Sequence, residues 1–130
     1  MIHTDVSRIF DQGTVVFPDH KEDINKKSWY TPPGWVGVSL KDIITGKDTG
    51  GAFSYHLVRI TRHCEVPSHV HDTEWEWNVI LNGNGSFVIK EKETQVAIGE
   101  TYVTPPGISH TVKAGNSDLV ITATFVPALG

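Results

Sequence analysis

The sequence predicts an all-β domain, built as a sandwich or barrel of short strands. Three observations lead to this prediction. Val, Ile, Thr and aromatic residues gather in short runs, as they do in strands. Gly, Pro and Asn interrupt these runs every several residues, and no segment shows the sustained periodicity of an amphipathic helix. Short strands with regular breaks are typical of sandwiches and barrels.

The expected elements follow from these runs in chain order. The segment 19–28 is expected to hold one short helical turn at most. The clearest turn signal is Asn82-Gly83-Asn84-Gly85, which is typical of a hairpin between two apolar runs. The predicted strands are Thr14–Phe17, Val36–Ile44, Phe53–Ile60, Glu74–Leu81, Ser86–Lys90, Thr94–Ala97, Glu100–Val103, Ser109–Lys113 and Leu119–Val126.

The length of 130 residues predicts a single domain with an adequate core. Residues 1–35 are less regular than the rest and contain Trp29, Tyr30 and Trp35 beside prolines. We expect them to form an N-terminal arm that packs on the barrel or on a neighbouring subunit. The barrel itself is expected over residues 36–130.

Composition excludes several classes of protein. The balance of 11 basic against 15 acidic side chains leaves no basic stripe for nucleic acid. No apolar run is long enough to span a bilayer, and the first residues do not resemble a signal peptide. The single cysteine, Cys64, excludes a framework of intramolecular disulfides. These features favour a cytoplasmic protein that binds neither nucleic acid nor membranes.

Three histidines and a carboxylate form a candidate metal site. His69 and His71 are two residues apart, so on a strand their imidazoles point to the same face. Glu76 follows at the start of the next predicted strand, and His110 comes from a distant strand. Three neutral imidazoles and a carboxylate suit one divalent transition metal ion. Glu74, on the same face of its strand as Glu76, is the rival carboxylate.

The spacing of these residues resembles that of a known family. The segment His69–Glu76, followed after six residues by Gly83, resembles the first motif of the cupin superfamily. Gly99, five residues, Pro105–Gly107, two residues and then His110 resemble the second motif. The resemblance implies a small single-domain cupin whose fold is a double-stranded β-helix, or jelly-roll barrel. It also implies that His69, His71, Glu76 and His110 hold Fe, Mn, Ni or Zn.

The chain departs from the family pattern at two positions. His63 stands six positions before His69, where the first motif usually opens with Gly. Glycine serves there because the turn needs a positive φ, a conformation that histidine adopts less readily. Ala114 stands where the second motif usually ends with Asn. Both departures fall at turns or edges and leave the four ligand positions intact.

Other polar residues are candidates for a catalytic role. The predicted strand Phe53–Ile60 carries Tyr55 and Arg59 on one face and His56 on the other, and the sequence leaves open which face is inward. Arg59 could anchor a carboxylate, and His56 could act as a general acid or base. Glu74 could serve as an outer acid or base near the metal. A packed, hydrogen-bonded or solvent-exposed residue is the alternative at each position.

The strand that carries Glu76 also predicts an apolar outer face. If Glu76 faces inward, so do Asn78 and Ile80. The outward face is then formed by Trp75, Trp77, Val79 and Leu81, a large stripe to leave in water. The arm could cover this stripe, or a second copy of the chain could do so. The stripe and the resemblance to cupins favour a homodimer.

The sequence leaves two functions open. Four protein ligands leave free positions on an octahedral ion, as a catalytic site requires. The first hypothesis is therefore an enzyme that acts on a small oxygenated molecule by metal-assisted oxygenation or isomerisation. The second is a non-catalytic module that binds or senses a small ligand through the metal. The chain has no helix-turn-helix segment, which favours the enzyme. A storage barrel ranks last because all four ligands are present.

Overall fold

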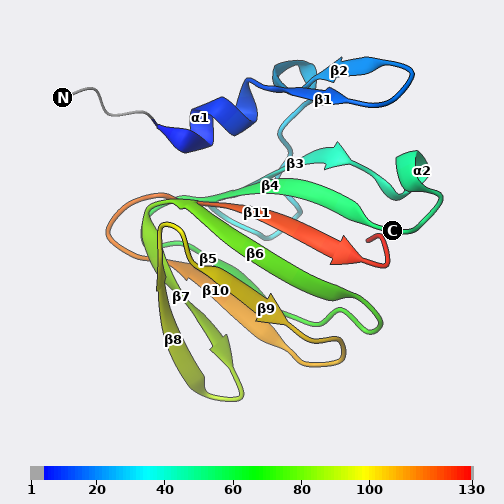
Figure 1. Ribbon diagram of the computed structural model, residues 1–130. Coiled ribbons are helices and arrows are strands. Elements are labelled where there is room, and N and C mark those ends of the chain that lie inside the picture. The colour runs from blue at the N-terminus through cyan, green and yellow to red at the C-terminus, as the bar shows by residue number, and fades with distance from the viewer. Residues whose placement is uncertain (1–4, 130) are drawn as a thin grey trace.

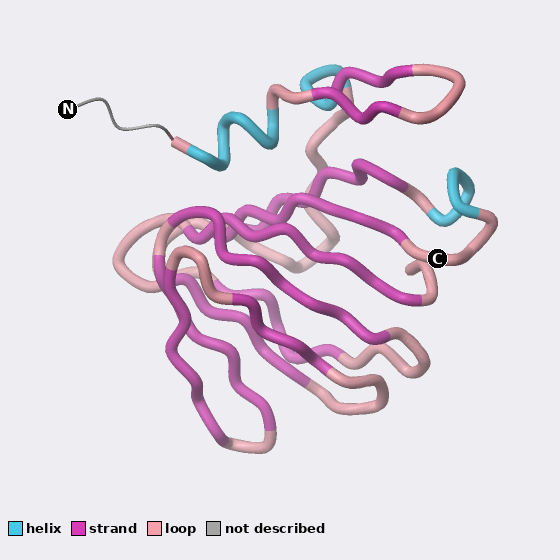
Figure 2. The backbone as a smooth tube through the Cα atoms, viewed as in Figure 1, coloured by secondary structure: helices cyan, strands magenta, loops and turns pink. Residues whose placement is uncertain are grey.

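The computed structural model describes residues 5–129 and shows a barrel of two antiparallel sheets that face each other (Figures 1 and 2). One sheet has five strands in the order β3 (Val38–Ile44), β4 (Ser54–Ile60), β11 (Leu119–Val126), β6 (Trp75–Asn82) and β9 (Thr101–Thr104). The other has four strands in the order β5 (Glu65–His69), β10 (His110–Ala114), β7 (Asn84–Ile89) and β8 (Lys92–Ala97). The predicted all-β fold is confirmed.

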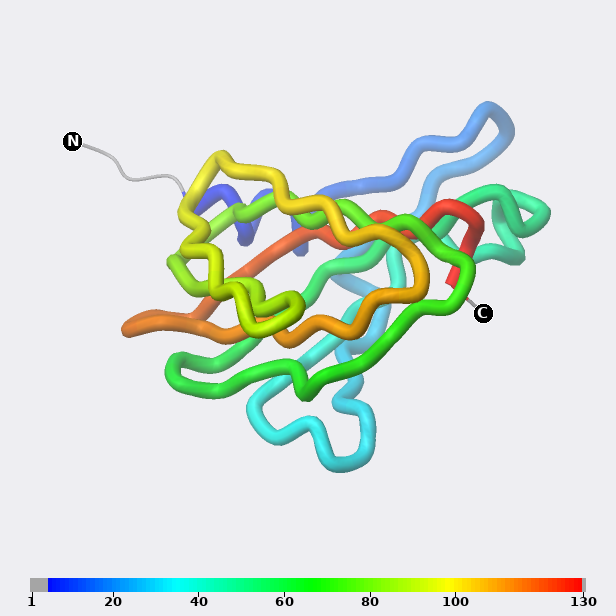
Figure 3. Tube along the Cα trace, turned by 90° about the horizontal axis from the view of Figure 1, so that it is seen from below, coloured from blue at the N-terminus to red at the C-terminus, as the bar shows by residue number. Residues whose placement is uncertain are grey.

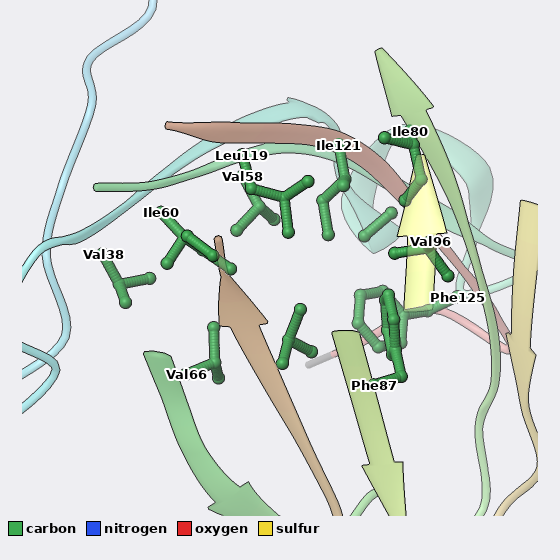
Figure 4. Packing of buried hydrophobic residues seen from close by; sticks show 13 residues of the cluster. Val38, Val58, Ile60, Val66, Ile80, Phe87, Val96, Leu119, Ile121 and Phe125 are labelled. Atoms are coloured by element: carbon green, nitrogen blue, oxygen red, sulfur yellow. The ribbon is translucent and has the colours of Figure 1, made fainter. Parts of the chain in front are cut away.

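The main core lies between the two sheets. Along each strand, alternate residues point inward, so every strand contributes one face to the core. In Figure 4 the side chains of Val58, Ile60 and Ile121 from the five-stranded sheet point toward the strands that carry Val66 and Phe87. Phe87 also stacks on Tyr102, with ring centroids 4.2 Å apart. These packed apolar side chains hold the two sheets together. Polar residues occupy one end of the interior.

One strand of the barrel was not among the predicted runs. Strand β5 contains Pro67, and a proline within a run argues against a strand because it cannot donate a ladder hydrogen bond. The structure explains the exception, since β5 is an edge strand that pairs only with β10. The sequence also did not predict β2 (Lys21–Asp23) or the helices α1 (Val6–Asp11) and α2 (Gly46–Thr49).

The prediction that Asn82-Gly83-Asn84-Gly85 forms a hairpin is wrong. Strand β6 ends at Asn82 and β7 begins at Asn84, but the two strands belong to different sheets. Gly83 therefore forms a corner between sheets. Its φ is +81°, and a Cβ atom there would clash with the carbonyl oxygen of Asp118. The motif glycine is required because the two chain segments approach so closely.

His63 adopts the conformation expected for a position that glycine usually holds. Its φ is +62°, and its backbone N–H donates to the carbonyl oxygen of Gly115 at 3.1 Å. Histidine tolerates the left-handed region better than β-branched residues do. The turn before β5 is therefore kept although the family glycine is missing.

The first part of the N-terminal arm, residues 5–26, lies over the outer face of the five-stranded sheet, whereas Tyr30 and Trp35 line a cavity between the two sheets (Figures 1 and 3). This part of the arm contains α1, β1 (Thr14–Val16), β2 and the short 3-10 helix η1 (Ile24–Lys26), while residues 1–4 lie outside the described part. The hairpin β1–β2 projects beyond the barrel in both views. A second apolar cluster forms between this arm and the sheet; its buried members are Ile24, Ile43, Leu57, Leu81 and Val120.

A buried charge pair ties the arm to the sheet. Lys41 of β3 is only 2% exposed, and its Nζ donates to Asp11 Oδ1 at 2.5 Å. The same ammonium donates to the carbonyl oxygen of Ile24 at 3.2 Å and lies 5.1 Å from the centroid of the Trp29 ring. The arm therefore supplies the partners that a buried lysine needs.

Over residues 5–129, no helix combines the length and hydropathy that crossing a bilayer would need.

Candidate metal centre

Three strands and a corner bring the four predicted ligands together at one end of the barrel interior. His69 ends β5 and His110 begins β10, and the register of these strands places the two residues opposite each other. His71 lies two residues beyond the end of β5. Glu76 is the second residue of β6 in the opposite sheet. The group therefore bridges the two sheets, and we call these four residues the ligand cluster.

The distances within the ligand cluster suit a single ion. One ligand atom from each of the four residues lies within 4.8 Å of all the others. Glu76 Oε1 is 3.3 Å from His110 Nε2 and 3.8 Å from His71 Nε2. Metal–ligand bonds are about 2.0–2.2 Å for imidazole nitrogen and carboxylate oxygen, so atoms that share an ion lie about 3–4 Å apart. The cluster needs little rearrangement to enclose one ion.

Neighbouring groups orient the ligands. His69 Nδ1 lies 2.8 Å from the carbonyl oxygen of Pro67, which can only accept, so Nδ1 carries the proton and Nε2 is free to bind a metal. Thr104 Oγ1 donates to Glu76 Oε1 at 3.2 Å. Thr104 was not singled out from the sequence. It acts through the pairing of β9 with β6, which sets Thr104 opposite Glu76, and no local pattern reveals that register.

Burial favours the metal-binding form of His69 and His71. Burial lowers the pKa of His69 below its ordinary value, and nearby His110 and His71 add to this effect. Burial also lowers the pKa of His71, and Glu76 opposes this shift. Neutral imidazole is the ligating form. His71 Nε2 is buried with no hydrogen-bond partner among the described residues, as expected of an atom whose partner is an ion. The residues present therefore fit a metal.

The ligand cluster opens on a small cavity of about 80 Å³ between the sheets. Asn78 of β6 lines it two residues after Glu76, as the strand alternation predicted. The amide is 1% exposed, and its Oδ1 has no hydrogen-bond partner within residues 5–129. Tyr30 and Leu129 also line the cavity but are exposed, so they mark its mouth. The cavity thus joins the ligand cluster to the outside.

His56 is on the inward face of β4 and lines the same cavity, which resolves the question left open by the sequence. Its Nδ1 lies 2.8 Å from Asp42 Oδ1, and its Nε2 lies 2.9 Å from Ser54 Oγ. Tyr30 donates to the same Asp42 oxygen at 2.8 Å, and burial together with this carboxylate raises the pKa of Tyr30 to about 12. Phe125 separates His56 from the cluster, since its ring lies against both His56 and His71.

The other two candidates for catalysis lie outside the cavity. Arg59 is on the outer face of β4, where its guanidinium pairs with Asp118 at 2.8 Å. We therefore do not retain Arg59 as an anchor for a substrate carboxylate at this site. Glu74 precedes β6, is half-buried and accepts a hydrogen bond from Thr73. It is not part of the ligand cluster, in agreement with the preference for Glu76.

The apolar stripe on the outer face of β6 is covered only in part. Leu81 is 8% exposed and Val79 is half-buried, because both pack in the cluster under the arm. Trp75 and Trp77 lie beyond the arm and are 51% and 38% exposed. Strand register places exposed Val126 beside Trp75 and exposed Val103 beside Trp77. We call Trp75, Trp77, Val103 and Val126 the outer patch.

Comparison with known proteins agrees with this geometry. A model of the cupin domain family matches residues 56–125, which include all four residues of the ligand cluster. No significant match was found among curated protein sequences. The match to the family model therefore carries the sequence evidence for kinship.

Many solved structures share the fold. One is a predicted oxalate decarboxylase from Thermotoga maritima, with a TM-score of 0.71, 22% identity, and coverage of 81% of this chain and 96% of that one. KdgF from Halomonas sp. gives a TM-score of 0.70 at 15% identity, and the match covers 81% of this chain and 92% of KdgF. The polyketide cyclase RemF from Streptomyces resistomycificus gives a TM-score of 0.68 at 17% identity, and the match covers 78% of this chain and 75% of RemF. At these identities the likeness concerns the fold alone.

Proposed function

The chain belongs to the cupin family, and from this premise we propose that the ligand cluster holds one divalent transition metal ion and acts on a small oxygenated molecule by metal-assisted oxygenation or isomerisation. The observation that carries the proposal is the convergence of four ligand atoms within 4.8 Å beside a cavity that opens outward. The jelly-roll barrel that the resemblance implied positions these atoms, because the two sheets contribute different ligands.

The protein side chains have separate tasks in this proposal. The neutral imidazoles and the Glu76 carboxylate hold the ion, and Thr104 keeps the carboxylate turned toward it. The ion, when bound, supplies a Lewis acid for a carbonyl or a redox centre for dioxygen. Four protein ligands leave two positions of an octahedral ion for the small molecule. Asn78 and the apolar walls orient that molecule and exclude water from around it.

The metal is tested by elemental analysis of protein purified without a metal-affinity tag. We expect about one equivalent of Fe, Mn, Ni or Zn per chain, since one cluster is present. Dioxygen uptake with each reconstituted metal then separates the two reactions: uptake with iron supports oxygenation, and turnover without uptake supports isomerisation. Protein that binds none of these metals at stoichiometric concentration would contradict the proposal.

A second candidate function is a non-catalytic module that binds or senses a small ligand through the metal. One observation favours it: both ring nitrogens of His56 are engaged, by Asp42 and by Ser54. The cavity histidine outside the cluster therefore has no nitrogen free to move a proton to or from a ligand. Tight binding of small acids, sugars, diketones or phenols without conversion, under every metal and with oxygen present, would support this candidate over the enzyme.

We also propose that the chain forms a homodimer through the outer patch. The patch combines two tryptophans with two valines on one open sheet face, and aromatic residues of this kind dominate protein interfaces. Sedimentation at micromolar concentration should give twice the chain mass. Trp77→Lys should give a folded monomer, while Val16→Lys, an exposed apolar position in the arm hairpin, should remain dimeric. A wild-type monomer would show that the patch is not a self-association surface.

A further inference from the structure

The walls of the cavity and one unpartnered amide define what kind of ligand fits beside the ligand cluster. We infer that the ligand is a compact 2-hydroxy acid or similar chelator that carries at most one anionic group, has an apolar remainder, and donates a hydroxyl hydrogen bond to Asn78. The inference rests on the proposed metal function, because the chelating oxygens are assigned to the ion. It goes beyond that function by naming the chemistry of the molecule bound.

The apolar remainder follows from the residues around the ligand cluster. Val58, Ile121 and Phe125 line the cavity and belong to the main core, and Figure 4 shows Val58 and Ile121 pointing into the interior. Trp35 also lines the cavity and lies against His69, with ring centroids 5.4 Å apart. A polar group pressed against such walls loses its water without gaining a partner. The part of the ligand that does not touch the ion is therefore hydrocarbon.

The limit of one anionic group follows from the charges near the cavity. A divalent ion held with one glutamate carboxylate leaves a single positive charge, which one anionic oxygen of a ligand neutralises. Of the described residues that line the cavity, none is lysine or arginine. Arg59 is on the far face of its strand with Asp118, and Lys41 is under the arm with Asp11. A second anion would therefore be taken out of water without a cation.

The hydroxyl follows from Asn78. Its Nδ2 donates to the Tyr102 carbonyl oxygen at 3.5 Å across the pairing of β6 with β9, which sets the orientation of the amide. Its Oδ1 then remains buried without a donor, although buried amide oxygens usually have one. Asn78 is two residues from Glu76 on the same strand face, and its amide and the ligand cluster border the same cavity. A hydroxyl that chelates the ion still carries a hydrogen to donate to Oδ1.

Size limits the ligand as well. The cavity measures about 80 Å³. An apolar cavity of roughly 150 Å³ accommodates benzene, so this one suits a branched chain of a few carbons rather than a fused ring system. A longer molecule would extend past Tyr30 and Leu129 at the mouth.

Three probes test these features by calorimetry on zinc-loaded protein. The first is 2-hydroxyisovalerate, which has one carboxylate, a hydroxyl and a branched apolar end. In 2-oxoisovalerate a carbonyl replaces the hydroxyl, and in malate a second carboxylate replaces the apolar end. We expect 2-hydroxyisovalerate to bind up to about tenfold more tightly than 2-oxoisovalerate, because one hydrogen bond is worth about that factor at most, and at least about tenfold more tightly than malate, whose second charge has no partner. If malate binds as tightly as 2-hydroxyisovalerate or more tightly, the inference that the ligand has an apolar remainder is wrong.

Matched variants isolate the hydroxyl contact. Asn78→Leu removes the acceptor, so it should weaken 2-hydroxyisovalerate about tenfold and change 2-oxoisovalerate less than about twofold. Asn82→Leu makes the same substitution on the same strand outside the cavity, and should leave all three affinities unchanged. Equal loss for both probes in Asn78→Leu would overturn the role of the amide. If that variant does not fold, equal affinity of wild-type protein for the hydroxy and oxo acids would overturn it instead.

Failure of the ligand class is distinguishable from failure of the metal function. Zinc content is measured before each titration, so protein without zinc contradicts the metal function directly. Zinc-loaded protein that binds none of the three probes contradicts only the ligand class. Binding of 2-hydroxyisovalerate to metal-free His71→Ala with wild-type affinity would show that the ion is not the anchor, and would overturn the chelation on which the inference rests.

Discussion

Polar groups are buried on both sides of the five-stranded sheet, under the arm and in the cavity, and the two sets differ in how completely their hydrogen bonds are satisfied. Under the arm, the Lys41 ammonium has both Asp11 and the Ile24 carbonyl as partners. In the cavity, His71 Nε2, His110 Nδ1 and Asn78 Oδ1 have none, and they are all of the buried side-chain polar atoms without a partner across residues 5–129. A satisfied buried group stabilises the fold, whereas unsatisfied groups gathered in one cavity indicate a binding site.

The strongest test of this contrast is loss of a ligand from the cavity. His71→Ala should reduce metal content from about one equivalent to near zero, because one of the four ligand atoms is lost. At metal a thousandfold above the wild-type dissociation constant, binding stabilises the wild type by about 4 kcal/mol, and the variant should lack this increment. Metal analysis and thermal unfolding with and without chelator measure both effects.

Two controls accompany this variant. His20→Ala removes a histidine of the arm outside the ligand cluster and should keep full metal content. In chelator, His71→Ala should change the free energy of unfolding by no more than about 1 kcal/mol, because the lost packing is offset by removal of an unpartnered nitrogen. Full metal occupancy in His71→Ala would mean that the ligand assignment is incorrect.

Removal of a partner from the satisfied group should instead cost stability directly. Asp11→Ala leaves a lysine that is 2% exposed without its counter-charge, and we expect a loss of about 3 kcal/mol in the free energy of unfolding. Asp23→Ala breaks the exposed pair of Asp23 with Lys26 and should cost no more than about 0.5 kcal/mol. Urea denaturation compares the two. Similar small losses would indicate that the arm can shift to let water reach Lys41.

A smaller effect is expected when an unsatisfied group of the cavity is made apolar. In metal-free protein, Asn78→Leu removes a buried oxygen that has no donor and gives up only the 3.5 Å contact to Tyr102. We expect the free energy of unfolding to stay the same or rise by about 1 kcal/mol. Substitutions that remove a functional polar group often stabilise a protein in this way. A loss above about 2 kcal/mol would mean that the amide supports the fold rather than a ligand.

The smallest expected effect is on the pH dependence of the metal-free protein. The pKa values of His69 and His71 lie below the ordinary 6.5. As pH falls through 6.5, the unfolded chain therefore takes up protons that the folded protein does not, so stability decreases with acidification. His71→Ala should flatten this decrease. Thermal unfolding between pH 7.5 and about pH 5 shows the slope.

His20 provides a comparison of opposite sign. Hydrogen bonds to Asp19 and Glu22 raise the pKa of His20, so the folded state gains protons there first as pH falls. Its contribution to stability is present below 6.5 and is lost as pH rises through the raised pKa. His20→Ala should therefore make the decrease on acidification slightly steeper. The same slope in wild type and both variants would show that these histidines do not govern the acid response.

Predictions from local patterns succeeded where the signal lies within one strand. The last strand was placed at residues 119–126, as found, and the alternation around Glu76 correctly assigned Asn78 and Ile80 to the interior. Predictions failed where the outcome depends on which strands are neighbours in a sheet. Pro67 is tolerated because β5 lies at an edge, and Asn82–Gly85 forms a corner because its two strands pair with other partners.

The sequence by itself determined the all-β class and the four residues of the ligand cluster, because residue type and spacing carry that information. Only the tertiary structure decided that His56 rather than Arg59 faces the cavity, that Thr104 orients Glu76, and how far the arm covers the outer face. The reason is physical: the two-residue repeat of a strand says which side chains share a face, but not which face turns inward. That choice, and the pairing that sets Thr104 opposite Glu76, depend on contacts between residues far apart in the chain.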